Sequence, residues 1–318
     1  MTRWACWASI LSPEVCLLVF DAYPKVNVFL KIIGIDARGY HLLDSRFCLA
    51  RGALKDTICI KTADTFSLKG NFTCSMEDNT IYKALRSLKQ YLESNGRAHE
   101  VKQLENLSIE VEKNIPTGAG LGGGSSDAGA VLWHLNEEFF SLSMPELYEV
   151  GARVGADVCF FLSRQESANV YGVGEVIEAF EEEPLELEIY TPPIACDTKE
   201  VYEEYDRGVR EAQKQKSVGL CALNLTHGAS LMGADSLIHG GSLTHGNYHY
   251  KQFAAESSKE ILTRGEREGL NDLYAPALRA YPALKDHVLT LGKEWFFSGS
   301  GSSFFRLKEG VRVESGGC

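Results

Sequence analysis

A glycine-rich segment, residues 116–128, has the composition of a phosphate-binding loop. It reads P-T-G-A-G-L-G-G-G-S-S-D-A and contains five glycines. Glycines let the backbone approach a ligand closely and direct successive N–H groups at it. Ser125, Ser126 and Asp127 then begin a helix, whose N-terminus carries a positive partial charge. We therefore predict a phosphate site here in preference to a plain glycine turn with a polar cap.

Two common phosphate-binding loops fit this segment poorly. A Walker A loop ends in Gly-Lys-Ser/Thr, and residues 116–128 contain no lysine. Gly118, Gly120 and Gly123 do satisfy the G-x-G-x-x-G pattern of dinucleotide-binding folds. That pattern follows a buried, almost entirely apolar parallel strand, whereas residues 107–113 alternate apolar and charged side chains. A nicotinamide-dependent dehydrogenase is therefore disfavoured.

The pattern P-x-x-x-G-L-G-G-G-S-S-x-A resembles the ATP-binding motif of the GHMP kinases, which include galactokinase, homoserine kinase and mevalonate kinase. The triple glycine is most similar to the branch that phosphorylates the 2-hydroxyl of 4-diphosphocytidyl-2-C-methyl-D-erythritol, on the non-mevalonate route to isoprenoid precursors. The resemblance implies ATP accompanied by Mg²⁺, whose ligands the sequence does not identify. It also implies an ATP-binding loop made of Pro116, Gly118, Gly120, Leu121, Gly122, Gly123, Gly124, Ser125 and Ser126.

Two further blocks resemble the catalytic groups of this family. Residues 22–31, A-Y-P-K-V-N-V-F-L-K, place Lys25 and Asn27 on one face of a strand. The resemblance makes Lys25 a cation that stabilises the transferring charge and Asn27 a hydrogen-bonding group for the sugar alcohol. Asp157, in G-A-D-V, would be the general base and would meet Lys25 across the active-site cleft. Cys159 stands where the family usually has proline, which leaves Asp157 in place.

Three other blocks match the family in chain order. Tyr40 and His41, in G-Y-H, resemble the pair that binds cytosine, and Tyr202 stands where a second aromatic would cover the base. Asn79, in E-D-N-T, resembles a residue near the nucleotide, although alone it predicts only a helix N-cap. The segment S-G-S-G-S-S-F-F resembles a third glycine motif beside the phosphate site, and its matching residues are Gly299, Gly301 and Ser302.

Hydrophobic periodicity predicts the elements that position these residues. Apolar residues alternate with polar ones in 26–33 and 107–112, which predicts strands, and recur at helical spacing in 80–94. The same patterns predict further strands within 46–62, 169–180, 185–192 and 294–307, and helices at 126–139 and 144–155. The acidic run at 181–183 is expected to be a solvated hairpin end.

The resemblance implies the two-domain α+β fold of the GHMP kinases, with the active site in the interdomain cleft. The N-terminal domain, residues 21–168, would be like domain 2 of ribosomal protein S5 and would bind ATP. The C-terminal substrate domain, residues 169–318, would be ferredoxin-like. Residues 208–262 carry four histidines among glycine and serine, and we expect a mobile surface insert there in preference to a metal site.

Charge and cysteine usage limit the partners and the compartment. The chain of 318 residues has a net charge of −11, which gives no general attraction to nucleic acid or to an anionic membrane. Nine scattered cysteines favour buried thiols in a reducing cytoplasm. Pro13 and Glu14 interrupt the apolar N-terminal run, so we expect a poorly ordered leader over residues 1–20. A monomer or a homodimer is expected.

Two alternatives remain open. The chain could be a GHMP kinase for another small alcohol, of the homoserine or mevalonate type, although G-Y-H and K-x-N disfavour this. It could also be a non-catalytic nucleotide-binding protein, although binding alone requires neither Lys25 nor Asp157.

Overall fold

The computed structural model describes the backbone of residues 17–226 and 251–308, and the side chains of 17–214 and 251–308. It divides into two compact units, and each is discontinuous in sequence. The first unit contains the chain up to Pro24, Arg51–Ile115 and Gly122–Arg164; the second contains Lys25–Ala50, Pro116–Leu121 and the chain from Gln165 onward. These units differ from the consecutive segments 21–168 and 169–318, because strands within Lys25–Ala50 pair with a strand that follows Gln165.

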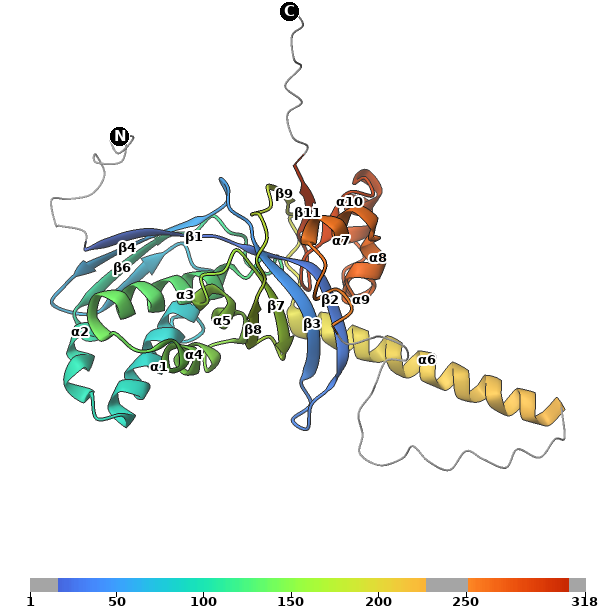
Figure 1. Ribbon diagram of the computed structural model, residues 1–318, viewed down its shortest axis with the longest axis horizontal. Helices are drawn as coiled ribbons and strands as arrows, with labels where there is room; N and C mark the ends of the chain where they lie inside the picture. The colour runs from blue at the N-terminus through green and yellow to red at the C-terminus, as the bar shows by residue number, and fades with distance from the viewer. Residues whose placement is uncertain (1–16, 227–250, 309–318) are drawn as a thin grey trace, which may run out of the picture. The chain divides into compact units, whose positions relative to one another are not determined.

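The first unit is a four-stranded sheet covered by helices. The strand order is β1-β4-β6-β5, and only the β5–β6 pair is parallel. Figure 1 shows helices gathered on one face of this sheet. The strands are β1 (Leu18–Ala22), β4 (Asp56–Thr62), β5 (Ser67–Gly70) and β6 (Leu107–Glu112). The helices are α1 (Thr80–Ser94), the 3₁₀ turn Ala98–Glu100, α2 (Val101–Glu105), α3 (Gly123–Leu135), the π-helical turn Asn136–Phe140, α4 (Met144–Ala152) and α5 (Ala156–Leu162).

The periodicity of the sequence accounts for the core of this unit. The predicted apolar stripe of α1 is buried, as are the alternating apolar residues of β6. These side chains pack with the apolar residues of α3, including Val131 and Leu132, in one hydrophobic core. The core therefore fixes α3, and with it the helix start that follows the glycine-rich segment.

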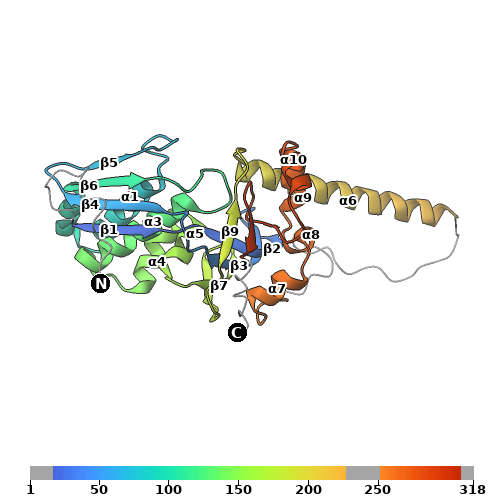
Figure 2. The ribbon, with the colours of Figure 1, turned by 90° about the horizontal axis from the view of Figure 1, so that it is seen from above.

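The second unit contains two antiparallel sheets and several helices. Their strand orders are β2-β3-β7-β8 and β10-β11-β9. Helix α9 packs beside α6, as Figures 1 and 2 both show. The strands are β2 (Lys25–Ile35), β3 (His41–Leu49), β7 (Ser167–Gly172), β8 (Val176–Ala179), β9 (Leu187–Tyr190), β10 (Phe296–Phe297) and β11 (Phe304–Leu307). The helices are α6 (Thr198–Thr226), α7 (Ser258–Arg264), α8 (Arg267–Leu270), α9 (Tyr274–Ala280) and α10 (Leu284–Thr290).

The expected insert at 208–262 is only partly a loop. Helix α6 continues to Thr226, and residues 251–257 form turns that lead into α7. The four histidines of this segment lie in 227–250, outside the described residues, so the metal hypothesis there is not addressed. In the described parts of the chain, no group of His, Cys, Asp or Glu side chains could hold a metal ion.

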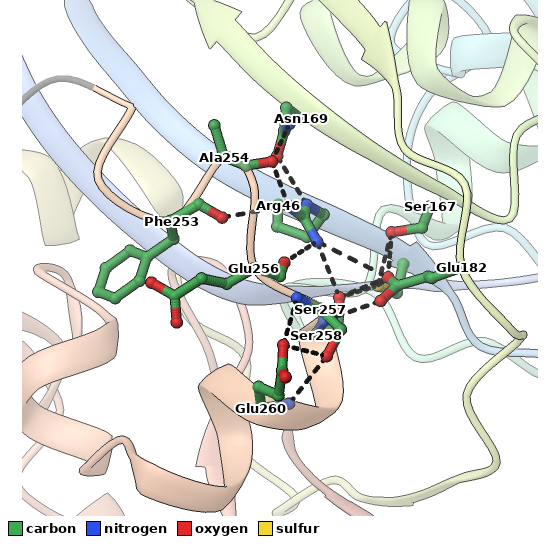
Figure 3. A network of polar contacts seen from close by, with 11 residues as sticks. Arg46, Ser167, Asn169, Glu182, Phe253, Ala254, Glu256, Ser257, Ser258 and Glu260 are labelled. Atoms are coloured by element: carbon green, nitrogen blue, oxygen red, sulfur yellow. Dashed lines mark hydrogen bonds and ion pairs between the residues drawn. The ribbon is translucent and has the colours of Figure 1, made fainter.

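A buried arginine holds the end of this segment, as Figure 3 shows. The Arg46 side chain is 0% exposed and donates to Asn169 Oδ1 at 2.6 Å and to Ala254 O at 3.1 Å. Glu182 accepts from Ser258 N at 2.8 Å and lies 3.8 Å from the guanidinium of Arg46. The prediction that the acidic run is a solvated hairpin end is therefore wrong for Glu182, because the buried cation and hydroxyl groups bind it.

Two further predictions concern cysteines and membranes. Cys48, Cys159 and Cys196 are buried thiols, as expected. The expectation is wrong at Cys74, which is an exposed thiol, and at Cys59, which is disulfide-bonded. Over residues 17–226 and 251–308, no helix has both the length and the apolar character that crossing a membrane requires.

Candidate functional site

The glycine loop has the backbone conformation that an anion cradle needs. Gly118, Gly120 and Gly122 all have positive φ, between 68° and 71°, at every second residue. Left-handed residues spaced in this way turn successive N–H groups toward one side of the chain. Gly122 is the N-cap of α3, so the loop leads directly into a helix start. The segment can therefore hold a phosphate with backbone donors alone.

Within the second unit, the first half of this loop packs on the third glycine motif. Ser298 Oγ donates to Gly120 O at 3.0 Å, and Ser303 N donates to Ala119 O at 3.1 Å. The approach is close, since a Cβ added at Gly120 would lie 2.2 Å from Ser298 O. Glycine is therefore required at this contact. The predicted association of the two glycine motifs is confirmed, and Gly299, Gly301 and Ser302 lie in the turn that makes it.

Lys25 and Asn27 lie beside the same loop. The Lys25 backbone N donates to Leu121 O at 2.9 Å, which ties the start of β2 to the loop. Lys25 is 4% exposed, and its Nζ donates to Asn27 Oδ1 at 2.7 Å. Asn27 in turn donates from Nδ2 to Ser45 Oγ at 3.1 Å. The two side chains share a strand face, as predicted, and Lys25 is not a solvent-facing lysine.

Asn271 supports this arrangement and was missed in the sequence. Its Nδ2 donates to Phe297 O at 3.0 Å and to Gly299 O at 2.9 Å, while its Oδ1 accepts from Leu273 N at 2.8 Å. The residue also forms a β-bridge with Leu30 of β2. Asn271 therefore joins the strand that carries Lys25 to the third glycine turn. Only the turn-forming pair Asn-Asp in L-N-D-L could have indicated it.

Within the first unit, neighbouring groups hold the second half of the loop. Thr80 Oγ1 donates to Gly124 O at 2.7 Å, and Ser126 Oγ donates to Tyr23 O at 2.6 Å. Asn79 caps α1, because its Oδ1 accepts from Ile81 N at 2.9 Å. The predicted N-cap at Asn79 is confirmed, and it places Thr80 against the loop. Ser125 stands in the first turn of α3.

Asp157 lies in the first turn of α5, in the first unit. Its helix packs against α3, the helix that begins at the glycine loop. Cys159, in place of the family's proline, is buried in α5, and its Sγ lies 3.9 Å from Tyr148 O. The helix therefore includes the substituted position, and Asp157 keeps its place at the helix start.

The aromatic group proposed to bind a base forms around His41, in the second unit. The rings of His41 and Tyr202 lie 4.7 Å apart, and His41 Nε2 lies 2.8 Å from Asp206 Oδ1. Tyr40 is 59% exposed at the turn before β3, with the Arg38 guanidinium 5.3 Å from its ring. Asp206 was missed, although it lies one helical turn after Tyr202 and so shares its face. His41 and Tyr202 are thus brought together, and Tyr40 stands next to them in sequence.

Comparison with known proteins identifies the family. The model of the GHMP kinases N terminal domain matches residues 79–165. A 4-diphosphocytidyl-2-C-methyl-D-erythritol kinase of Helicobacter acinonychis is 49% identical over 91% of this chain and 96% of its own length. The chain belongs to the 4-diphosphocytidyl-2-C-methyl-D-erythritol kinase family, a branch of the GHMP kinases. A kinase of the same name from Sulfurimonas denitrificans is 38% identical over 92% of the chain and 97% of its own length.

Solved structures agree with this family. A crystal structure of 4-(cytidine 5'-diphospho)-2C-methyl-D-erythritol kinase matches with a TM-score of 0.62 and 27% identity, covering 92% of this chain and 91% of that one. A homoserine kinase from Cytophaga hutchinsonii matches with a TM-score of 0.50 and 15% identity, covering 94% and 87%, which supports the fold alone. The predicted α+β GHMP kinase fold is confirmed, and the chain is an ATP-using small-molecule kinase.

Proposed function

We propose that this chain transfers the γ-phosphate of ATP to the 2-hydroxyl of 4-diphosphocytidyl-2-C-methyl-D-erythritol, on the non-mevalonate route to isoprenoid precursors. The observation that carries the proposal is the convergence of Lys25 and Asn27, the glycine loop and the third glycine turn through direct hydrogen bonds and close backbone contact. The curated relatives named for this activity cover almost the whole chain. ATP would enter as its Mg²⁺ complex, with the metal belonging to the substrate.

In this proposal Asp157 and Lys25 perform the chemistry. The Asp157 carboxylate takes the proton of the substrate hydroxyl, whose oxygen then forms a bond to the γ-phosphorus while the bond to the β-phosphate oxygen breaks. The products are the phosphate ester and ADP, and the proton on Asp157 passes to solvent. The Lys25 ammonium stabilises negative charge on the transferring group. Its hydrogen bond to Asn27 Oδ1, at 2.7 Å, holds it in one orientation.

The remaining residues would bind the substrates. The loop from Pro116 to Ser126 would hold the ATP phosphates, with Asn79 near the nucleotide, and Asn27 would bind the sugar alcohol. His41, Tyr202 and the adjacent Tyr40 would bind the cytosine base by stacking and edge contacts. We further propose a cytoplasmic monomer or homodimer without a nucleic-acid or membrane partner, in keeping with the net charge of −11.

Steady-state kinetics with a panel of alcohols tests this proposal. The wild type should release ADP with 4-diphosphocytidyl-2-C-methyl-D-erythritol and not with homoserine or mevalonate. Asp157→Asn should lower kcat by about 10²- to 10⁴-fold, because it removes the general base, while the KM for ATP stays within about twofold. Asp64→Asn, at an exposed position of the same unit, is the matched control. Turnover of homoserine or mevalonate alone would reject the substrate assignment, and full activity of Asp157→Asn would reject the base.

A further inference from the structure

Two buried carboxylates and the half-buried lysine between them lie beside the glycine loop and have no part in the proposed chemistry. Asp56 begins β4, Lys113 directly follows β6, and Asp127 lies in α3 just past the loop. Lys113 Nζ bridges the two carboxylates, with a contact to Asp56 Oδ2 and another to Asp127 Oδ2 at 2.7 Å. Asp56 is 0% exposed and Asp127 is 2% exposed. Two carboxylates removed from water at such a position require an explanation, because burying charged groups is costly.

The cluster fixes the chain where it enters the loop. Asp56 Oδ1 accepts backbone hydrogen bonds from Asn114 N at 2.5 Å and from Ile115 N at 2.8 Å, the two residues before Pro116. Asn114 Nδ2 also donates to Lys55 O at 3.1 Å. One carboxylate therefore holds the last residues before the loop at the start of β4.

The same cluster fixes the chain where it leaves the loop. Lys113 reaches from the entry side to Asp127 on α3, so one side chain spans both ends. The two ends also touch, since a Cβ added at Gly123 would lie 2.7 Å from Ile115 Cγ2 and 3.6 Å from Lys113 Nζ. The residues between these ends, 116–122, carry the three left-handed glycines. The curvature of residues 116–122 therefore depends on the distance between Ile115 and Gly123.

We propose that Asp56, Lys113 and Asp127 form a positioning clasp, which sets the conformation of the glycine loop and so the affinity for ATP. The inference rests on the proposed role of the loop as the phosphate site. The clasp does not touch the reacting atoms, so it acts on the binding of ATP and leaves the transfer step unchanged once ATP is bound.

The clasp also makes the affinity for ATP depend on whether Asp127 is protonated. Burial raises the pKa of Asp127 to about 7, against the opposing influence of Lys113. Lys113 is the ion-pair partner of Asp127 among the described residues, and Asp56 is the other nearby charge. Asp127 Oδ1 has no hydrogen-bond partner in the described parts of the chain. With Asp127 protonated the cluster is neutral; ionised Asp127 adds one negative charge near the start of α3, which opposes a bound polyphosphate. ATP should therefore bind more tightly to the protonated form.

Initial-rate kinetics on the full chain test the clasp. Asp127→Ala, which frees α3 from Lys113, should raise the KM for ATP about tenfold, with kcat and the KM for the alcohol within about twofold. Asp127→Asn can still accept from Lys113 and should restore the KM for ATP. Between about pH 6 and about pH 8.5, the wild-type KM for ATP divided by that of Asp127→Asn should rise about three- to tenfold. This ratio cancels the ionisation of ATP itself.

The control and the contrary outcomes separate this inference from the proposed function. Glu100→Gln breaks the ion pair between Arg97 and Glu100, which is 2.7 Å long and lies in the same unit, and should change neither KM. If Asp127→Ala lowers only kcat or thermal stability, the cluster has a structural role alone, and the proposal that it sets the affinity for ATP is rejected. A ratio that does not change with pH rejects the proton connection. Absence of turnover by the wild type would instead reject the proposed function.

Discussion

Replacing Gly120 by alanine tests whether the contact between the two glycine motifs controls activity. Gly120 has a φ of +71°, and an added Cβ would lie 2.2 Å from Ser298 O and 3.0 Å from Gly301 N. The contact to Ser298 falls well below the 3.0 Å that Cβ atoms keep from backbone atoms. Neither neighbour is the end of a mobile side chain, so one of the two turns must move by about 1 Å.

Two terms set the size of the effect. A left-handed alanine costs about 1–2 kcal/mol, and crowding of packed atoms adds about 1–3 kcal/mol. The free energy of unfolding should therefore fall by about 2–5 kcal/mol. A displacement of about 1 Å at a positioned site can lower the rate about 100-fold. Because the displaced turns adjoin Lys25 and the phosphate loop, we expect kcat/KM for ATP to fall by that factor.

A second glycine supplies the matched control. Gly96 has a φ of +74°, and a Cβ added there meets no atom of the described residues within 4 Å. The free energy of unfolding of Gly96→Ala should therefore fall only by the cost of a left-handed alanine, about 1–2 kcal/mol, and the variant should keep full activity. Urea unfolding and ADP release would be measured on both variants. The reasoning is refuted if Gly120→Ala keeps wild-type kcat/KM, or if its loss of stability does not exceed that of Gly96→Ala.

Two further predictions concern buried charges. Because burial raises the pKa of Asp127 from 3.8 to about 7, its contribution to stability is complete below about pH 4 and is lost as the pH rises through 7. The free energy of unfolding of Asp127→Asn minus that of the wild type, measured in urea, should therefore rise by about 4 kcal/mol between pH 4 and pH 8. A difference that does not change with pH would contradict this. Arg46→Met leaves Glu182 without its buried cation and should cost about 3–5 kcal/mol, with faster proteolysis near Ala254; a loss below about 1 kcal/mol would contradict this.

Local sequence patterns were sufficient for several elements and for the local arrangement of some of the proposed site residues. The apolar spacing of residues 80–94 predicted α1, and the alternation in 26–33 predicted the strand that carries Lys25 and Asn27. Both follow from periodicity alone, because a helix or strand must turn its apolar side to a core. The glycine loop was recognisable because five glycines directly before a helix start favour a backbone that a ligand or another segment can approach closely. For each of these, the signal lies within about fifteen consecutive residues.

Contacts between distant segments could not be predicted in this way. Arg46 binds residues that are more than 200 positions later in the chain, and no local pattern indicates which strand end they will meet. Glu182 was misjudged for the same reason, since an acidic run is solvated unless a cation from elsewhere is buried beside it. Asn271 is likewise recognisable only from the carbonyl groups of Phe297 and Gly299 that it binds. Side-chain partners across the fold depend on tertiary packing, which a single sequence does not display.

The acidity of the chain has a consequence for where its function can be altered. With a net charge of −11, the chain offers polyanionic substrates little general attraction, so binding must come from local groups. In the proposed phosphate site, the glycine loop, these groups would be backbone N–H donors, which no substitution can remove directly except by proline. What substitutions can change is their orientation. Within the first unit, Asp56 and Lys113 bind Ile115 and Asp127, which flank the loop. Within the second unit, Ser298 binds Gly120 of the loop, and Asn271 binds Gly299 of its partner turn. Loss of ATP affinity by mutation should therefore concentrate in these supporting residues as much as in the glycines themselves.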